Sequence, residues 1–220
     1  MRQISRKTLS EQIHDMLREE ILTQEIPCGE KLTIRQLQQR FGTSSTPVRD
    51  AMVRLAQDGL LDQVSNVGAR VVVLTERDIR EIYSLCEILD VAALEGAAGG
   101  ANAAAFLDAL RACLACQEAA LGKGELADFH HHSDHFHALF YEHAGNRRLA
   151  EAAEQIRGQL SILTHRYQNL QRASEIVLDE HRQLVRVLAG QTPGLAGELL
   201  RRHIRHGMAF LLEGLESGQA

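Results

Sequence analysis

Two short helical segments joined by a tight turn constrain the fold of this chain more than any other feature of its sequence. Thr33 and Gln36, three residues apart, form a capping-box pattern that starts the first helix, and Gly42 ends it. The hydroxyl-rich run 43–46 then starts a second helix that extends to Gly59. Two helices joined by so few residues must cross each other, which is the arrangement of a helix-turn-helix.

The segments on either side complete a small domain. Apolar residues recur with a helical period over residues 9–26, before a Pro-Cys-Gly sequence that stops the helix. Two β-capable runs, 60–64 and 69–74, follow the second helix and are joined by residues that favour a hairpin turn. Three helices followed by a β-hairpin predict a winged helix-turn-helix over residues 1–75, a domain whose third helix enters the major groove of DNA.

The start of the third helix carries groups that suit DNA. Hydroxyl and guanidinium side chains donate hydrogen bonds to phosphates and base edges, and a helix N-terminus favours an anion. An arginine at the start of the second helix faces the same backbone, and the hairpin tip is placed to reach a neighbouring minor groove. The alternative interpretation is that the arginines are solvated surface charges and the tip is a plain turn. The candidate DNA contacts are Arg35, Ser44, Ser45, Thr46, Arg49, Asn66 and Gly68.

Helical periodicity runs through the whole of residues 76–220. Short joints, most of them containing glycine, divide this part into six segments. In the fourth segment, apolar residues recur every three or four positions, as expected for a helix with one face in a core. We therefore expect a mainly α protein in which the winged helix-turn-helix precedes an all-α antiparallel helical bundle. The expected helices span residues 76–98, 101–121, 125–144, 146–170, 174–189 and 193–214.

Charge and histidine content divide the chain at the same boundary. The 24 Lys and Arg against 29 Asp and Glu give a net charge of −5, which argues against a protein that coats nucleic acid non-specifically. Residues 1–75 contain 10 basic and 9 acidic residues, whereas residues 76–220 contain 14 basic and 20 acidic residues. The excess of acidic residues therefore lies in the second part. The second part also holds 10 of the 11 histidines. We expect the two parts to have different tasks.

The location of the protein is predicted from its apolar segments. No apolar stretch reaches the roughly 20 residues that a transmembrane helix needs. The basic N-terminus leads into an amphipathic segment and not into an apolar signal region. We expect a cytoplasmic protein whose cysteines are reduced.

Three histidines in the second part are candidate metal ligands. His137, His181 and His203 lie on three different predicted helices, and each has apolar neighbours that turn it toward the bundle interior. Three imidazoles that converge in an apolar cavity suit a borderline divalent metal ion such as zinc or nickel, with positions left open for a carboxylate or water. Taken singly, each histidine is more often a hydrogen-bonded, partly buried residue. The combination predicts the metal site.

Several motifs in the first part occur in the order and spacing of a known family. They are residues 17–22, 26–32, 55–60 and, above all, 44–51, Ser-Ser-Thr-Pro-Val-Arg-Asp-Ala. This pattern resembles the N-terminal domain of GntR-family transcription regulators and implies a DNA-binding function. Ser45 departs from the pattern, because many members have an arginine there that contacts DNA. The departure implies weaker binding or a different operator.

The second part resembles the FCD ligand-binding domain of the FadR subfamily, in its smaller, VanR-like version with six helices. The resemblance rests on Phe136 and His137, on residues 144–149 and 180–184, and on His203. It implies a metal ion held by an aspartate and three histidines. The three histidines carry over to the three candidates above.

The aspartate of the family pattern does not carry over. Ser133 stands four residues before His137, whereas Asp134 stands three residues before it. Positions three and four residues back share a helix face, so Asp134 is the expected substitute. Otherwise the site contains three histidines alone or no metal ion.

A second departure concerns the ligand of the domain. Family members have an Arg-x-x-x-Glu pattern on the first helix, in which the arginine meets a carboxylate, and the aligned residues here are Cys86 and Asp90. This departure weakens the expectation of an organic acid. Arg157, beside the inner face of the fourth helix, is the expected positive charge for the effector, although a surface salt bridge explains it equally well.

These features together predict a transcription regulator and not an enzyme. We expect a metabolite-responsive repressor that binds double-stranded DNA at an inverted-repeat operator as a homodimer, with a small carboxylate effector at or near the metal. The first alternative is a metal-responsive sensor, in which zinc or nickel is itself the signal. A metal-dependent hydrolase is the remote alternative, since the sequence contains no His-Glu-x-x-His motif.

Overall fold

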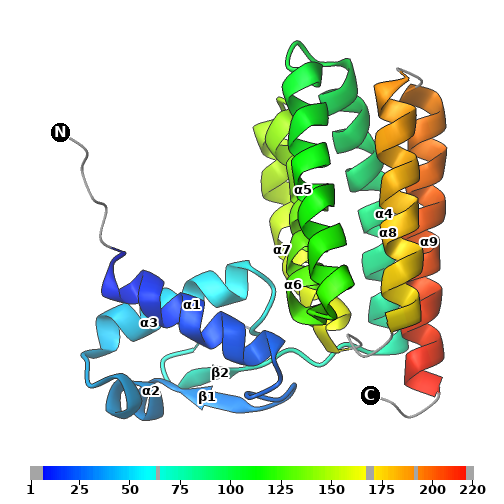
Figure 1. The fold of residues 1–220 in the computed structure, drawn as a ribbon. Coiled ribbons are helices and arrows are strands. Elements are labelled where there is room, and N and C mark those ends of the chain that lie inside the picture. Colours follow the sequence, from blue (N-terminus) through cyan, green and yellow to red (C-terminus); the bar gives the residue numbers. More distant parts are fainter. Residues whose placement is uncertain (1–6, 63–64, 167–170, 191–192, 217–220) are drawn as a thin grey trace.

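The computed structural model describes residues 7–62, 65–166, 171–190 and 193–216. They form a small domain and a tall helical bundle that stands beside it (Figure 1). The small domain contains α1 (Leu9–Leu22), β1 (Lys31–Thr33), α2 (Ile34–Phe41), α3 (Ser45–Gln57) and β2 (Gly68–Arg70). The bundle contains α4 (Glu76–Gly99), α5 (Ala103–Lys123), α6 (Leu126–His143), α7 (Arg147–Arg166), α8 (Gln171–Ala189) and α9 (Pro193–Glu216). This mainly helical architecture confirms the predicted fold class.

The helices of the predicted helix-turn-helix are α2 and α3. Thr33 caps α2 through a full capping box, and Gly42 ends it with a left-handed φ of 60°, which favours glycine. The first helix is shorter than the predicted range 9–26. It ends at Leu22, because the chain turns at Gln24, whose φ is 62°.

The strand pairing of the small domain differs from the prediction. β2 pairs antiparallel with β1, a strand that the sequence did not predict. A three-residue strand with a single buried side chain has too little alternation to be recognised. Within the described part of the predicted hairpin, Leu61 and Val71 form an isolated antiparallel bridge, while residues 63–64 lie outside the described residues.

Gly68, which was expected at the hairpin tip, lies within β2 and is buried. A Cβ atom at this position would stand 2.1 Å from the carbonyl oxygen of Leu32, so the close approach of the two strands requires glycine. The exposed residues that are described between the strand and the preceding bridge are Asp62, Ser65, Asn66 and Val67. The place of Gly68 is therefore in the packing of the sheet and not at an exposed tip.

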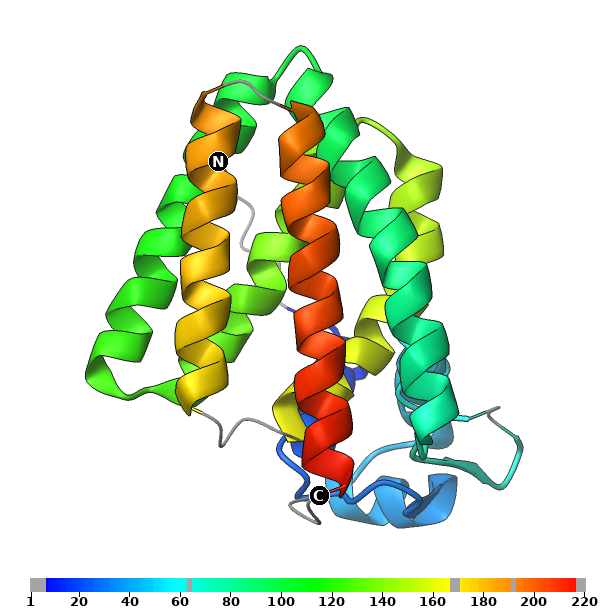
Figure 2. The same cartoon turned by 90° about the vertical axis from the view of Figure 1, so that its right-hand side faces the viewer.

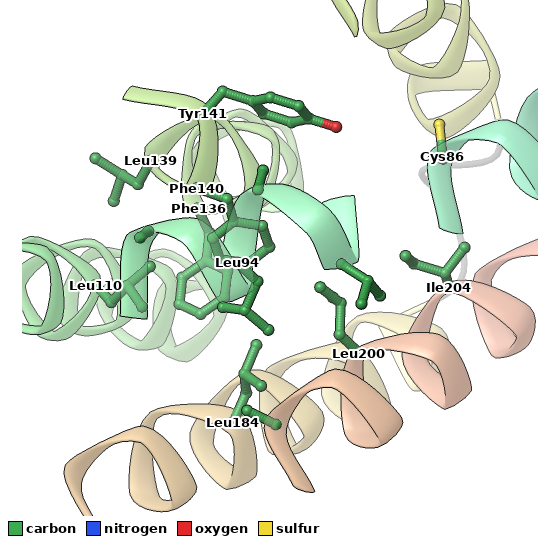
Figure 3. Close-up of a cluster of buried hydrophobic side chains, with 14 of the residues drawn as sticks. Cys86, Leu94, Leu110, Phe136, Leu139, Phe140, Tyr141, Leu184, Leu200 and Ile204 are labelled. Atoms are coloured by element: carbon green, nitrogen blue, oxygen red, sulfur yellow. The ribbon is translucent and has the colours of Figure 1, made fainter. Parts of the chain in front are cut away.

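The bundle core is built around aromatic side chains. Phe106 of α5 and Phe136 of α6 each pack edge to face against Phe140, with ring centroids 6.1 and 5.6 Å away. Figure 3 shows the aliphatic side chains that surround Phe136 and Phe140, among them Leu94, Leu110, Leu184 and Leu200. All six predicted helices are present with ends shifted by a few residues, and the predicted end at residue 170 lies outside the described residues. No helix in the described ranges is both long and apolar enough to cross a membrane.

Helix α7 connects the bundle to the small domain, and Figure 2 shows it behind α9. Ile162 of α7 is buried in the core of the small domain, and Gly158, one turn earlier, lies against the backbone of Asp58. Leu160 packs instead against the bundle core. Residues two positions apart point to nearly opposite sides of a helix, so α7 presents one face to each part. The sequence predicted only the bundle face.

Candidate functional site

Three histidines meet in the bundle interior. His137 on α6, His181 on α8 and His203 on α9 each offer a ring nitrogen, and these nitrogens lie within 4.8 Å of one another. The Nε2 atoms of His137 and His203 are 3.2 Å apart. His181 and His203 are buried, and His137 is half-buried. The structure thus brings together the three histidines that the sequence singled out.

A side-chain oxygen binds Nδ1 of each histidine, at 2.8 Å in every case. The acceptors are Asp90 for His137, Gln117 for His181 and Glu180 for His203. Each ring therefore carries its proton on Nδ1 and directs the lone pair of Nε2 inward. Outer partners of this kind orient metal-ligating histidines and raise their basicity.

The inward-facing nitrogens fit a metal ion. Nε2 of His181 is buried and has no hydrogen-bond partner among the described residues. The lone pairs of His137 and His203 face each other at 3.2 Å and repel unless a proton or a cation lies between them. A buried polar atom without a partner costs about 1–3 kcal/mol. A divalent cation would satisfy all three nitrogens at once.

The charges around the histidines also suit a cation. Burial lowers the pKa of His137 and lowers the pKa of His181 well below its usual range, so both rings stay in the neutral form that binds metal. Burial alone would raise the pKa of Asp90 and of Glu180, but hydrogen bonds with His137 and His203 hold both below their usual values. Two carboxylates therefore stand behind the imidazoles of His137 and His203, and a bound dication offsets their charge.

Asp134 lies outside the group of three histidines. Its Oδ2 accepts a hydrogen bond of 2.8 Å from Ser161 Oγ on α7. The buried carboxylate beside His137 is that of Asp90, which sequence reasoning did not select. A charged residue inside an apolar helical run was the available signal for Asp90. No comparable signal marks Gln117, because its partner is 64 residues away in the chain.

A cavity of about 120 Å³ opens beside the histidines. His137 and His203 line one part of it, together with Asp90. Cys86 lines the cavity too. Much of the remaining wall is apolar and comes from four helices, with the side chains of Phe129, Leu160, Val177, Ile204, Phe210 and Leu211.

Arg157 is not among the described residues that line this cavity. Its Nη2 donates a hydrogen bond of 2.6 Å to the carbonyl oxygen of Asp134, and its Nη1 lies 3.9 Å from Asp90 Oδ1. The guanidinium also lies over the ring of Tyr141, 5.6 Å from its centre. The structure therefore places the expected effector-binding arginine between α6 and α7, where it supports Asp90.

The candidate DNA contacts lie at the start of α3, at the start of α2 and in the segment that contains Asn66 and Gly68, which we call the wing. Residues 44–46 are exposed, and Ser44 is the N-cap of α3, although its side chain makes no capping hydrogen bond. Arg49 donates a hydrogen bond of 2.8 Å from Nη1 to Asn66 Oδ1, which connects α3 to the wing. Arg35 is exposed on the first turn of α2. These groups are accessible to a nucleic acid.

Two protein-family profiles match the chain in the order of its two parts. Residues 9–71 match the gntR family of bacterial regulatory proteins, and residues 81–206 match the FCD domain. The chain belongs to the GntR family of transcription regulators. Its winged helix-turn-helix is the GntR domain, and the FCD domain is the bundle that contains the three histidines.

Relatives of this GntR-family regulator match it along most of its length. A "probable D-xylose utilization operon transcriptional repressor" from Paenarthrobacter nicotinovorans is 28% identical over 210 residues, covering 92% of this chain and 88% of the relative. The HTH-type transcriptional repressor RspR from Escherichia coli (strain K12) is 23% identical over 199 residues, covering 90% and 86%. The solved structure of E. coli McbR/YncC superposes with a TM-score of 0.80 at 20% identity, covering 96% of this chain and all (100%) of the other. That structure shows the same fold.

Proposed function

We propose that this GntR-family protein is a metabolite-responsive repressor that binds an inverted-repeat operator as a homodimer and holds a zinc or nickel ion on His137, His181 and His203. The observation that carries the proposal is the convergence of three Nε2 atoms, each directed inward by a partner on Nδ1. Two relatives are named as repressors, which supports the direction of regulation.

The metal ion would lie in the wall of the cavity, next to the effector. A bound zinc or nickel ion supplies a Lewis-acidic position for the carboxylate of a small organic acid. The protein fixes the ligand geometry from behind, because Asp90 and Glu180 hold the rings of His137 and His203. For Asp134 to become a fourth ligand, its carboxylate has to leave Ser161.

DNA recognition is assigned to the start of α3 and to the wing. The exposed hydroxyls of residues 44–46 and the helix N-terminus suit phosphate contacts, and Arg49 suits a base edge in the major groove. Asn66, held by Arg49, extends the same surface toward the neighbouring groove. A near-neutral domain of this size binds DNA modestly, so two copies on an inverted repeat supply the affinity.

We assign the contact between the two copies of the homodimer to the exposed face of α4. Leu85 and Ile88 are 39% and 61% exposed, and Ala92, one further turn along the same face, is exposed as well. An apolar stripe on an outer helix face gains stability when a partner covers it. A two-fold contact of this stripe with itself matches the symmetry of an inverted repeat.

Helix α7 is the element that would transmit effector binding to the DNA-binding domain. Leu160 and Thr164 of α7 line the cavity, whereas Gly158 and Ile162 contact the small domain. A ligand that shifts the first face of α7 also shifts the second, because the helix moves as a rigid body. Effector affinity and operator affinity are then coupled, and the coupling is reciprocal.

Metal content and operator protection test the proposal on the purified full-length protein. We expect about one zinc or nickel ion per chain, lost in His181→Ala and retained in the control His143→Ala, whose imidazole bonds to the Leu139 carbonyl instead. Circular dichroism confirms that both variants fold. Wild type that stays metal-free after incubation with zinc and with nickel removes the metal from the proposal.

DNase footprinting near the gene of the protein should show a protected inverted repeat. Arg49→Ala should lower operator affinity by about 1–3 kcal/mol and relax the sequence specificity at the base that Arg49 contacts. Arg54→Ala is the matched control, because Arg54 lies on the last turn of the same helix and faces Glu11 of α1. No protected site, or equal affinities of Arg49→Ala and wild type, contradicts the assignment.

A metal-responsive sensor is the second candidate, and the same three histidines support it. In that case zinc or nickel alone changes operator affinity. In the metabolite-responsive case, the metal-loaded protein releases the operator only when an organic ligand is added. Fluorescence anisotropy with labelled operator separates the two.

A further inference from the structure

The cavity beside the histidines combines charged and metal-binding groups with a largely apolar wall. His137 and His203 line it together with the carboxylates of Asp90 and Asp134, and apolar side chains such as Phe129, Val177 and Phe210 form much of the wall. Cys86 also lines the cavity, and burial raises the pKa of its thiol to about 12, so it is neutral. The lining residues that the structure describes include no Lys or Arg. A second carboxylate on a ligand would meet no cation in this wall.

Ser174 of α8 is a separate feature of the cavity that points to a ligand. It lines the cavity, is 1% exposed, and its buried Oγ has no hydrogen-bond partner in the described part of the chain. Thr164, another hydroxyl in the wall, already donates to the carbonyl oxygen of Ser161 at 3.1 Å. A buried hydroxyl without a partner costs about 1–3 kcal/mol, which a ligand group recovers.

Ser174 and His181 lie on one face of α8. They are seven residues apart, two helical turns, and Val177 between them also lines the cavity. The rise along the helix axis over this distance is about 10 Å. A ligand that reaches from the histidines to Ser174 is therefore elongated, and its middle passes over an apolar wall.

We infer that the effector is an elongated monocarboxylate with an apolar body and one hydroxyl or carbonyl group at the end opposite its carboxylate, and that Ser174 recognises this group. The inference rests on the proposed function, in which the carboxylate binds at the histidine site. The cavity of about 120 Å³ has room for on the order of ten non-hydrogen atoms. Dicarboxylates and polyhydroxylated sugar acids would bury several polar groups without partners.

Isothermal titration calorimetry on the full-length, zinc-loaded protein tests the inference with matched pairs of acids. The pairs are benzoate with 4-hydroxybenzoate, and hexanoate with 6-hydroxyhexanoate, while succinate and gluconate are the polar comparators. We expect the hydroxylated member of at least one pair to bind about 5–10-fold tighter than its partner. We expect no measurable binding of succinate or gluconate.

Ser174→Ala should abolish the difference within the pair and leave the affinity for the unsubstituted acid unchanged. Ser10→Ala is the control, because Ser10 also has a buried hydroxyl without a described partner but lies on α1 in the small domain. Ser10→Ala should keep the full difference. A difference that survives Ser174→Ala, tighter binding of succinate or gluconate, or no binding by any of the acids overturns the inference.

The proposed function is tested separately on the same samples, by measuring their zinc content and the fluorescence anisotropy of labelled operator. If a hydroxylated acid binds with the expected dependence on Ser174 but leaves operator affinity unchanged, the regulatory proposal fails and the ligand class stands. If succinate or gluconate releases the operator, the ligand class fails and the regulatory proposal stands.

Discussion

Gly158 of α7 lies directly against the backbone of Asp58, the residue that ends α3: a Cβ atom at position 158 would stand 1.6 Å from the Asp58 carbonyl oxygen. One turn further along α7, Ile162 enters the core of the small domain. The helix that borders the ligand cavity therefore touches the end of the helix that we assign to DNA. Any change in the tilt of α7 reaches Asp58 without an intermediate element.

Gly158→Ala tests this contact. The added methyl group meets a backbone atom and cannot rotate away, so α7 and the small domain have to separate at a cost of about 1–3 kcal/mol. We expect a lower melting temperature and a changed operator affinity, with zinc binding unaffected. Calorimetry and operator anisotropy measure the two effects.

Gly122→Ala is the matched control for this substitution. Gly122 is also a helical glycine, on α5, and a Cβ atom there would meet nothing within 4 Å. Alanine is the better helix former, so this variant should be as stable as wild type or slightly more stable. Equal melting temperatures for the two variants would show that the close contact between Gly158 and Asp58 does not affect the stability of the protein.

Gln117→Leu tests the hydrogen bond that orients His181. Leucine has a similar volume but no acceptor for Nδ1 of His181, so the ring loses its fixed tautomer and direction. We expect zinc affinity to fall by about 10–100-fold, measured by competition with a chromophoric chelator. Gln117→Glu keeps an oxygen acceptor and should retain most of the affinity. If Gln117→Leu binds zinc as tightly as wild type, Gln117 does not position the ligand.

Ile88→Arg tests the dimer contact assigned to α4. A charged side chain at the centre of a two-fold apolar contact faces its own copy, so we expect a monomer in light scattering and weaker operator binding. Met16→Arg is the control, because Met16 is exposed to a similar degree, 50% against 61%, but lies on α1. A dimer that persists in Ile88→Arg assigns the contact to another face.

Local signals predicted most of the fold. The capping box at Thr33 and the glycine at Gly42 set the limits of α2, because both act within a few residues of the chain. The same holds for the bundle helices, whose apolar periodicity is long. β1 was missed because its pairing partner, 39 residues further along at Arg70 for Lys31, is what makes it a strand. Ile162 was missed because periodicity identifies a buried face but not the domain that buries it.

The site was predictable only in part, for the same reason. His137, His181 and His203 stand out by residue type and by their apolar neighbours. The acceptors behind them follow from how the helices are placed in space, and Asp90 is 47 residues from His137. For the same reason, Arg157 contacts the Asp90 carboxylate and the Asp134 carbonyl oxygen and does not line the cavity. Helix packing and not local pattern decides these contacts.

His14 on α1 contacts Asp58 and makes the stability of this region depend on pH. Its Nε2 lies 2.7 Å from Asp58 Oδ2, and its Nδ1 lies 3.0 Å from Asp15 Oδ1, while Lys7 pairs with Asp15 on the other side. The hydrogen bond with Asp58, helped by Asp15, raises the pKa of His14 above its usual value although partial burial opposes this. A pKa that is higher in the folded state means that the protonated ring stabilises the fold.

This stabilisation is fully present below the unfolded-state pKa of about 6.5 and is lost as the pH rises through the folded-state pKa. We therefore expect His14→Gln to lower the free energy of unfolding by about 1 kcal/mol near pH 5.5 and by clearly less near pH 8.5, in urea titrations at both values. Asp58→Asn removes the principal partner and should show the same pH dependence. A loss of equal size at both pH values would mean that His14 contributes through packing and not through its charge.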